Sequence, residues 1–201
     1  MKHIDWEAGR PDEDAILESW GRVSYEPIPA GGPATERFLA HVHDVYRRGG
    51  AILARFRVTG GDATLHWFAA RNLLCEYDFF KHFLGSEPVE RALPQLRIPQ
   101  ILRFLPFRDN ASGLLTLDGE LAALLVEGGA YKRFEGPAAE AKRLGVACVT
   151  ELTQDRYEDF LVYTSQTNWA PWFRGGIWDA TWLLVDRRDS EVTLLCVTDE
   201  S

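Results

Sequence analysis

The sequence predicts a single α+β domain over residues 1–201, in which a mostly helical N-terminal half packs on a mainly antiparallel sheet from the C-terminal strands. Apolar residues recur at helical spacing in several segments before residue 152. From Asp159 onward the apolar runs become strand-like, and only four polar residues join the last two. A length of 201 residues with 46% hydrophobic content fits one globular domain.

The first elements are separated by glycine and proline. The stretch PDEDAILESW predicts a helix, with acids in the first turn where the helix dipole favours them. The following YEPIPAGGP predicts a flexible linker near residues 25–33. A second helix is expected from Pro33 to Arg48, ended by two glycines. The alternating stretch AILARFRV, residues 51–58, then predicts a half-buried strand.

Further helices are expected in the middle of the chain. One should run from about Ala63 to Leu84, with Asp62 as its N-cap. The stretch LDGELAALLVEGG and the stretch GPAAEAKRLGVACVTEL predict two more, although Gly145 inside the second disfavours a helix by about 1 kcal/mol relative to alanine. The end of the second stretch is alternatively a strand.

The segment between these helices, residues 91–108, contains three prolines, so at most short helices fit there. It also contains four arginines and no acid. It is either a contact for an anion or partner, or the solvated face of a helical connection.

Strands dominate the C-terminal part. The segments DFLVYTS, ATWLLVD and EVTLLCVT predict three strands, the last two forming a hairpin around RRDS. Both hairpin strands are apolar on two faces, as in the centre of a covered sheet. Because side chains alternate, Trp182 and Leu184 should point to one face of the sheet and Leu183 and Val185 to the other.

Four of the seven tryptophans lie within residues 169–182. Trp182 is interpreted as a core residue, whereas Trp169, Trp172 and Trp178 flank a proline and two glycines in an expected loop. Such a loop either folds back over the core or presents its rings to a protein or a planar ligand.

The charge is distributed unevenly. Residues 1–20 carry six acids and two bases, and residues 151–201 carry ten acids and four bases, which gives −10 for the two ends. Residues 21–150, with fourteen acids and sixteen bases, carry +2. Acidic ends would repel nucleic acid and steer a basic protein partner, and plain solubility is the other interpretation.

The compartment is predicted from apolar runs. No run approaches the length that crosses a bilayer, and the acidic N-terminus lacks the hydrophobic segment of a signal peptide. A cytoplasmic protein without membrane contact is therefore expected.

No motif in the sequence specifies a reaction. The three cysteines are far apart, without a CxxC or Cys/His cluster, which disfavours disulfides and metal sites. His41 and His43 face different ways on an expected helix and cannot share one ion. Cys75 and His82 would lie about 10.5 Å apart along a helix, too far for a nucleophile and its base. We predict no catalytic residue, metal or cofactor, and an enzyme is the less favoured class.

The run WDATWLLVDRRDSEVTLLCVTDES, with LAALLVEGGAYKRFEG upstream, resembles a group of uncharacterised bacterial proteins that share a Trp-Asp-x-Thr strand, a Leu-Leu-Cys strand and a short acidic tail. Some of these proteins are similar to immunity proteins of polymorphic toxin systems. The resemblance covers roughly residues 117–200, and the ending TDES departs from its pattern. It implies a cognate toxin as partner and no chemistry of the chain's own.

Two functions are therefore expected. The first is a cytoplasmic inhibitor that binds a protein partner, such as a basic toxin domain. Its predicted contacts are Trp169, Trp172, Arg174 and Trp178 in the aromatic loop, with Asp155, Glu158, Asp159 and Asp179 as steering acids. The alternative is a small-molecule-binding protein or enzyme with an aromatic-lined pocket near residues 169–182, for which Asp179, His66 and Cys75 are candidate polar groups.

Overall fold

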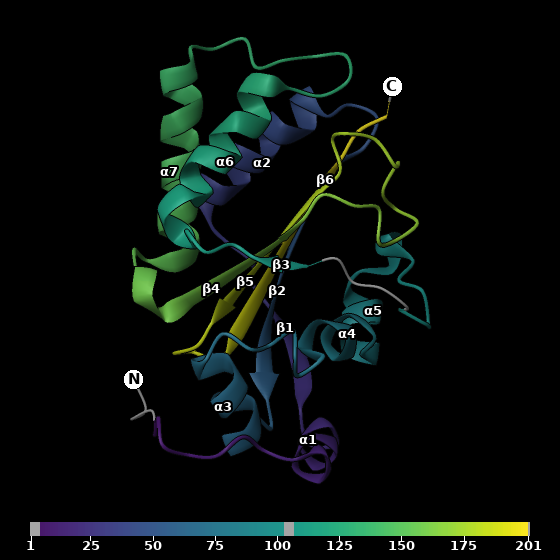
Figure 1. The fold of residues 1–201 in the computed structure, drawn as a ribbon. Coiled ribbons are helices and arrows are strands. Elements are labelled where there is room, and N and C mark those ends of the chain that lie inside the picture. Colours follow the sequence, from purple (N-terminus) through teal and green to yellow (C-terminus); the bar gives the residue numbers. More distant parts are fainter. Residues whose placement is uncertain (1–4, 103–106, 201) are drawn as a thin grey trace.

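The computed structural model describes residues 5–102 and 107–200, which form one six-stranded antiparallel sheet with helices on both faces (Figure 1). The sheet order is β1-β2-β6-β5-β4-β3. The strands are β1 (Ser24–Ile28), β2 (Gly50–Thr59), β3 (Arg108–Asp109), β4 (Phe160–Ser165), β5 (Ala180–Asp186) and β6 (Glu191–Thr198). The predicted α+β class is confirmed, and the predicted C-terminal strands make up β4, β5 and β6.

The helices form two layers that enclose the sheet (Figure 1). The α-helices are α1 (Glu13–Trp20), α2 (Pro33–Val45), α3 (Ala63–Ala70), α4 (Phe79–Leu84), α5 (Glu87–Ala92), α6 (Leu114–Glu127) and α7 (Ala138–Thr153). Two short 3-10 helices are η1 (Pro94–Leu96) and η2 (Tyr157–Asp159). Helices α2, α6 and α7 contribute one hydrophobic cluster, while α1, α3, α4 and α5 contribute the other.

The β5–β6 hairpin lies inside the sheet and supplies side chains to both clusters. Trp182 and Leu184 pack with α2, α6 and α7, whereas Leu183 and Val185 pack with the opposite helices, which confirms the predicted alternation. Every residue of β6 is buried. As expected, residues 187–190 connect the two strands.

The prediction of a flexible linker near residues 25–33 is wrong for residues 25–28, which belong to the edge strand β1 and pair with β2. Tyr25 explains the difference, because its ring packs edge-on against Phe83 at 5.0 Å and its hydroxyl lies 2.9 Å from His82 Nδ1. Pro27 is compatible with an edge strand, where one side of the backbone needs no partner.

The helix expected over residues 63–84 is two helices, α3 and α4, separated by a turn. Asn72 and Asp78 have positive φ angles of 56° and 52°, a left-handed conformation that a right-handed helix cannot include. The predicted N-cap is confirmed, since the Asp62 carboxylate accepts a hydrogen bond from the Leu65 N–H at 3.0 Å.

Helix α2 ends at Val45, three residues before the predicted end. The backbone N–H of Arg48 donates to the buried Asp199 carboxylate at 2.9 Å rather than to a helix carbonyl. The same carboxylate accepts from the Ala130 N–H at 2.8 Å. Asp199 therefore ties the ends of α2 and α6 to the end of β6.

Helices α6 and α7 approach each other at Gly145, and α7 stays helical through Thr153. A Cβ atom at Gly145 would lie 2.4 Å from the carbonyl oxygen of Asp118 on α6. This contact explains a glycine in a helix interior. Between α4 and β3, the described part of residues 91–108 contains only short helical pieces, as its prolines predict, and Arg103 lies outside the described residues.

Across residues 5–102 and 107–200, no helix combines the length and the apolar character needed to cross a membrane.

Candidate functional site

The aromatic loop, residues 166–179, connects β4 to β5 and largely covers the core. Trp169 and Phe173 are 7% and 6% exposed and belong to the cluster formed with α4 and α5. The indole N–H of Trp169 donates to the Thr181 hydroxyl at 2.9 Å. The sequence left open whether this loop folds back over the core or presents its rings to a partner. Trp169 and Phe173 fold back over the core.

Asp179, predicted as a steering acid, is buried at the end of the same loop, with 2% exposure. Its carboxylate accepts hydrogen bonds from the Thr198 hydroxyl at 2.5 Å and the Gly175 N–H at 2.7 Å. Gly175 has a φ of 77°, where a side chain would be strained. Asp179 thus fixes the loop to β6, and its charge is directed inward.

The remaining loop residues reach the surface. Trp172 and Trp178 are half-buried, and Arg174 is exposed and forms an ion pair with Glu200 at 3.6 Å. Ile177, which the sequence analysis did not single out, is 92% exposed. This part of the loop can contact a partner.

The other predicted acids lie around η2, before β4. Asp155 and Glu158 are exposed, and Asp155 accepts a hydrogen bond from the Thr150 hydroxyl at 2.8 Å. Asp159 is held by Arg156 at 3.7 Å, and the same guanidinium contacts Asp186 at 2.5 Å. Asp159 is therefore neutralised within the fold, whereas Asp155 and Glu158 face solvent.

The predicted contact residues consequently form two groups, one at each end of β4 (Figure 1). The six residues of β4 place the groups roughly 20 Å apart at about 3.3 Å per residue. The structure brings the aromatic loop together with Asp179, and Asp155 together with Glu158 and Asp159. It does not bring all eight residues onto one surface.

A hollow of about 360 Å³ lies beside Glu158. Leu115 of α6 and Tyr157 of η2 line it and are 76% and 44% exposed. We call Leu115, Tyr157, Glu158 and Asp155, which is two residues before Tyr157 in the chain, the Tyr157 surface. Sequence reasoning missed Leu115 and Tyr157; an apolar residue on the polar side of the α6 helical pattern was the available signal.

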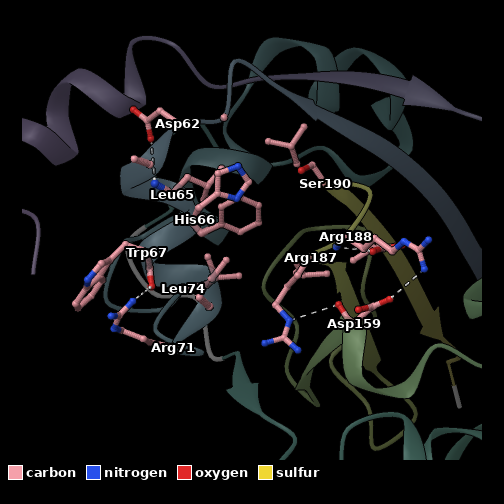
Figure 2. Close-up of a pocket in the computed structure, with 18 of the residues that line it drawn as sticks. Asp62, Leu65, His66, Trp67, Arg71, Leu74, Asp159, Arg187, Arg188 and Ser190 are labelled. Carbon is pink, nitrogen blue, oxygen red and sulfur yellow. Dashed lines mark hydrogen bonds and ion pairs between the residues drawn. The ribbon is translucent and has the colours of Figure 1, made fainter. Parts of the chain in front are cut away.

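A larger cleft of about 690 Å³ opens between α3 and the β5–β6 connection (Figure 2). Its walls include Asp5 and Ala8, residues of α3, residues 185–188, and Ser190 with Asp159. Figure 2 shows Leu74 and His66 on one side and Arg187 and Ser190 on the other. Asp5 and Asp159, one from each of the two acidic regions of the sequence, both line this cleft, together with Arg71, Arg187 and Arg188.

The charges of the cleft are partly matched by neighbours. Burial disfavours the ionised form of Asp62 and so raises its pKa. Hydrogen bonds from the Leu65 N–H, Arg22 and Ser19 stabilise the ionised form more strongly, so the pKa of Asp62 stays below its usual value. Arg22 lies 2.6 Å from Asp62. Arg187 instead donates to the backbone carbonyls of Glu158 and Asp159. Sequence reasoning treated Arg187 only as part of a polar connection.

The three polar groups proposed for a small-molecule site are not brought together. His66 lines the larger cleft, whereas Asp179 and Cys75 line neither of the two hollows. Burial, together with Asp109, Asp78 and Glu76, raises the pKa of the Cys75 thiol, which makes it a poor nucleophile at neutral pH. Neither hollow is lined by residues 169–182.

Among the described residues, no three His, Cys, Asp or Glu side chains gather in a way that could hold a metal ion. His43 and Asp44 lie near the end of α2, where Asp44 pairs with Lys132 at 2.7 Å.

A comparison with protein-family models finds no match to this chain. A comparison with curated proteins finds no significant match either.

Proposed function

We propose that the protein is a cytoplasmic inhibitor that binds one basic protein, in the way that an immunity protein binds its toxin. The Tyr157 surface carries the proposal. It combines two exposed apolar side chains, Leu115 and Tyr157, with two exposed carboxylates, Asp155 and Glu158. Exposed apolar side chains bordered by charge are typical of protein contacts, and tyrosine is frequent among the residues that dominate binding.

The charge of this surface favours a basic partner. The carboxylates of Asp155 and Glu158 have no ion pair within 4.0 Å in the part of the chain that the structure describes, so their charge is available to a partner. Such charges mainly raise the association rate and select the partner, while the apolar contacts at the centre hold the complex together.

The experiment measures binding of the purified protein to the product of the neighbouring upstream gene, at low and at moderate salt. We expect a stoichiometric complex, weakened at least about tenfold at low salt by Asp155→Asn/Glu158→Gln, because each lost charge contact is worth about 1 kcal/mol. The variant should also show a smaller salt dependence. The partner's toxic activity, assayed in parallel, should fall as the complex forms.

The matched control is Glu36→Gln/Glu140→Gln, which removes the same charge from exposed positions on α2 and α7. Equal affinities of the two double variants, or no complex at either salt, would contradict the proposal. Trp172→Ala/Trp178→Ala tests the opposite end of β4. A loss of binding confined to that variant would move the contact to the aromatic loop.

A further inference from the structure

Helix α3 lines the larger cleft with three small side chains and with the larger Leu65, His66 and Trp67. Ala63, Ala69 and Ala70 line the helix side, and Leu74 and Val185 complete an apolar interior. A volume of about 690 Å³ lies within the range of about 300–1,000 Å³ that small-molecule sites occupy. The cleft is thus large enough for a ligand with an aromatic or aliphatic body.

Charge distinguishes one side of this cleft. Three of the four acids on its walls have cationic partners, since Asp62 pairs with Arg22, and Asp186 and Asp159 pair with Arg156 at 2.5 and 3.7 Å. The fourth, Asp5, accepts a hydrogen bond from the Glu7 N–H. Arg187 and Arg71 have no carboxylate of the described residues within 4.0 Å, and each guanidinium donates to two backbone carbonyls. The Arg71 guanidinium also lies over the Trp67 ring at 4.3 Å, whereas Arg187 has no such ring contact among the described residues. A guanidinium has five N–H donors, so several remain for a ligand.

The positive charge of Arg187 lies beside the apolar interior of the cleft. Figure 2 shows its side chain on the side of the cleft that faces Leu74, with Ser190 on the same connection. Arginine binds carboxylate, sulfonate and phosphate groups through paired hydrogen bonds. If the acidic group of a ligand binds Arg187, the apolar part of the same ligand would therefore contact the alanines of α3.

We propose that this cleft binds a small amphipathic anion, with its apolar body between α3 and Val185 and its acidic group on Arg187. The apolar residues that line this cleft do not belong to the Tyr157 surface. Arg187, however, lines both the cleft and the smaller hollow beside Glu158. The inference does not depend on a protein partner.

The test uses two fluorescent probes that share their rings, 1-anilinonaphthalene-8-sulfonate and the uncharged N-phenyl-1-naphthylamine. We expect the sulfonate to bind one site per chain. Arg187→Gln should weaken it at least about tenfold, because a hydrogen bond to a charged group is lost, and should change binding of the neutral probe less than about twofold. Ala70→Phe, which fills the cleft, should weaken both probes.

Arg143→Gln is the matched control, since Arg143 is exposed on α7 in the opposite helical layer. Arg187→Lys keeps the charge but not the paired hydrogen bonds, so it should recover part of the sulfonate affinity that Arg187→Gln loses. This recovery separates a role of the charge from a scaffold role of the guanidinium. Sulfonate binding that is equal in Arg187→Gln and the unchanged protein would overturn the proposal. Binding of both probes that survives Ala70→Phe would overturn it as well.

Discussion

The Glu151 carboxylate on α7 accepts the backbone N–H of Thr35, 116 residues away at the start of α2, at 2.8 Å. It also accepts the N–H groups of Gly32 and Ala34, at 2.9 and 3.1 Å. Helix α2 has no capping side chain of its own, because Gly32 occupies the N-cap position. A carboxylate from another helix supplies the missing acceptor and complements the positive end of the α2 dipole.

This contact predicts acid sensitivity. Partial burial opposes ionisation, but the donors at the start of α2 outweigh it and lower the pKa of Glu151 to about 2, from 4.5. A pKa that is lowered in the folded state stabilises the protein above the unfolded value and ceases to do so as the pH falls through the folded value. Glu151→Gln should therefore lose about 1 kcal/mol at pH 7, and the difference in Tm from the unchanged protein should shrink between pH 4.5 and 2.

Glu135→Gln, at an 85% exposed position, is the control for this measurement. A Tm difference for Glu151→Gln that stays constant from pH 7 to pH 2.5 would show that its charge contributes nothing.

The contact between α6 and α7 predicts that two glycines respond in opposite directions. Gly145→Ala should destabilise the protein by about 1–3 kcal/mol, because its Cβ would collide with the Asp118 carbonyl and force the helices apart. Gly119→Ala, inside α6, should stabilise by up to about 1 kcal/mol, because its Cβ would meet only Lys142 Nζ, at 3.6 Å. Urea unfolding of both variants measures the difference. Stabilisation by both changes would mean that the helices lie farther apart.

The aromatic loop should depend on Asp179. Asp179→Asn replaces one acceptor oxygen by a donor that faces the Thr198 hydroxyl or the Gly175 N–H, so we expect a loss of about 1–3 kcal/mol. Trypsin should then cleave after the exposed Arg174 faster than in the unchanged protein. In a Thr198→Val background the effect of Asp179→Asn should be smaller, because one of its two partners is already gone. An unaltered cleavage rate would argue against this anchoring role.

Burial predicts unequal effects within the same loop. Trp169→Ala should cost about 3–5 kcal/mol, because it removes a large buried ring and leaves the Thr181 hydroxyl without its donor. Ile177→Ser, at a position that is 92% exposed, should change the free energy of unfolding by less than about 0.5 kcal/mol. Denaturant unfolding measures both, and similar losses would mean that the loop packs differently.

The elements that the sequence predicted best have strong local patterns. The β5–β6 hairpin follows from two apolar runs and a short connection, and the start of α3 follows from Asp62 as an N-cap. The break between α3 and α4 was missed because its cause is tertiary. Asn72 accepts a hydrogen bond from Tyr163 on β4, which no local pattern reveals.

The candidate sites were harder to predict for the same reason. Tryptophan content drew attention to residues 169–182, but Trp169 and Asp179 are buried by partners from β5 and β6. Arg187 is recognised only once its neighbours are known, because a guanidinium with a carboxylate partner and one without look identical in a sequence.

The sheet order also bears on how the protein forms in the cell. Strand β6 lies between β2 and β5, so Ile52 meets Cys196, 144 positions later in the chain, only after β6 has been translated. A nascent chain that ends before residue 191 has the apolar edges of β2 and β5 without the strand that joins them. Such edges are prone to aggregation, and contacts between distant segments form slowly. We therefore expect the sheet to be completed only after β6 has been synthesised.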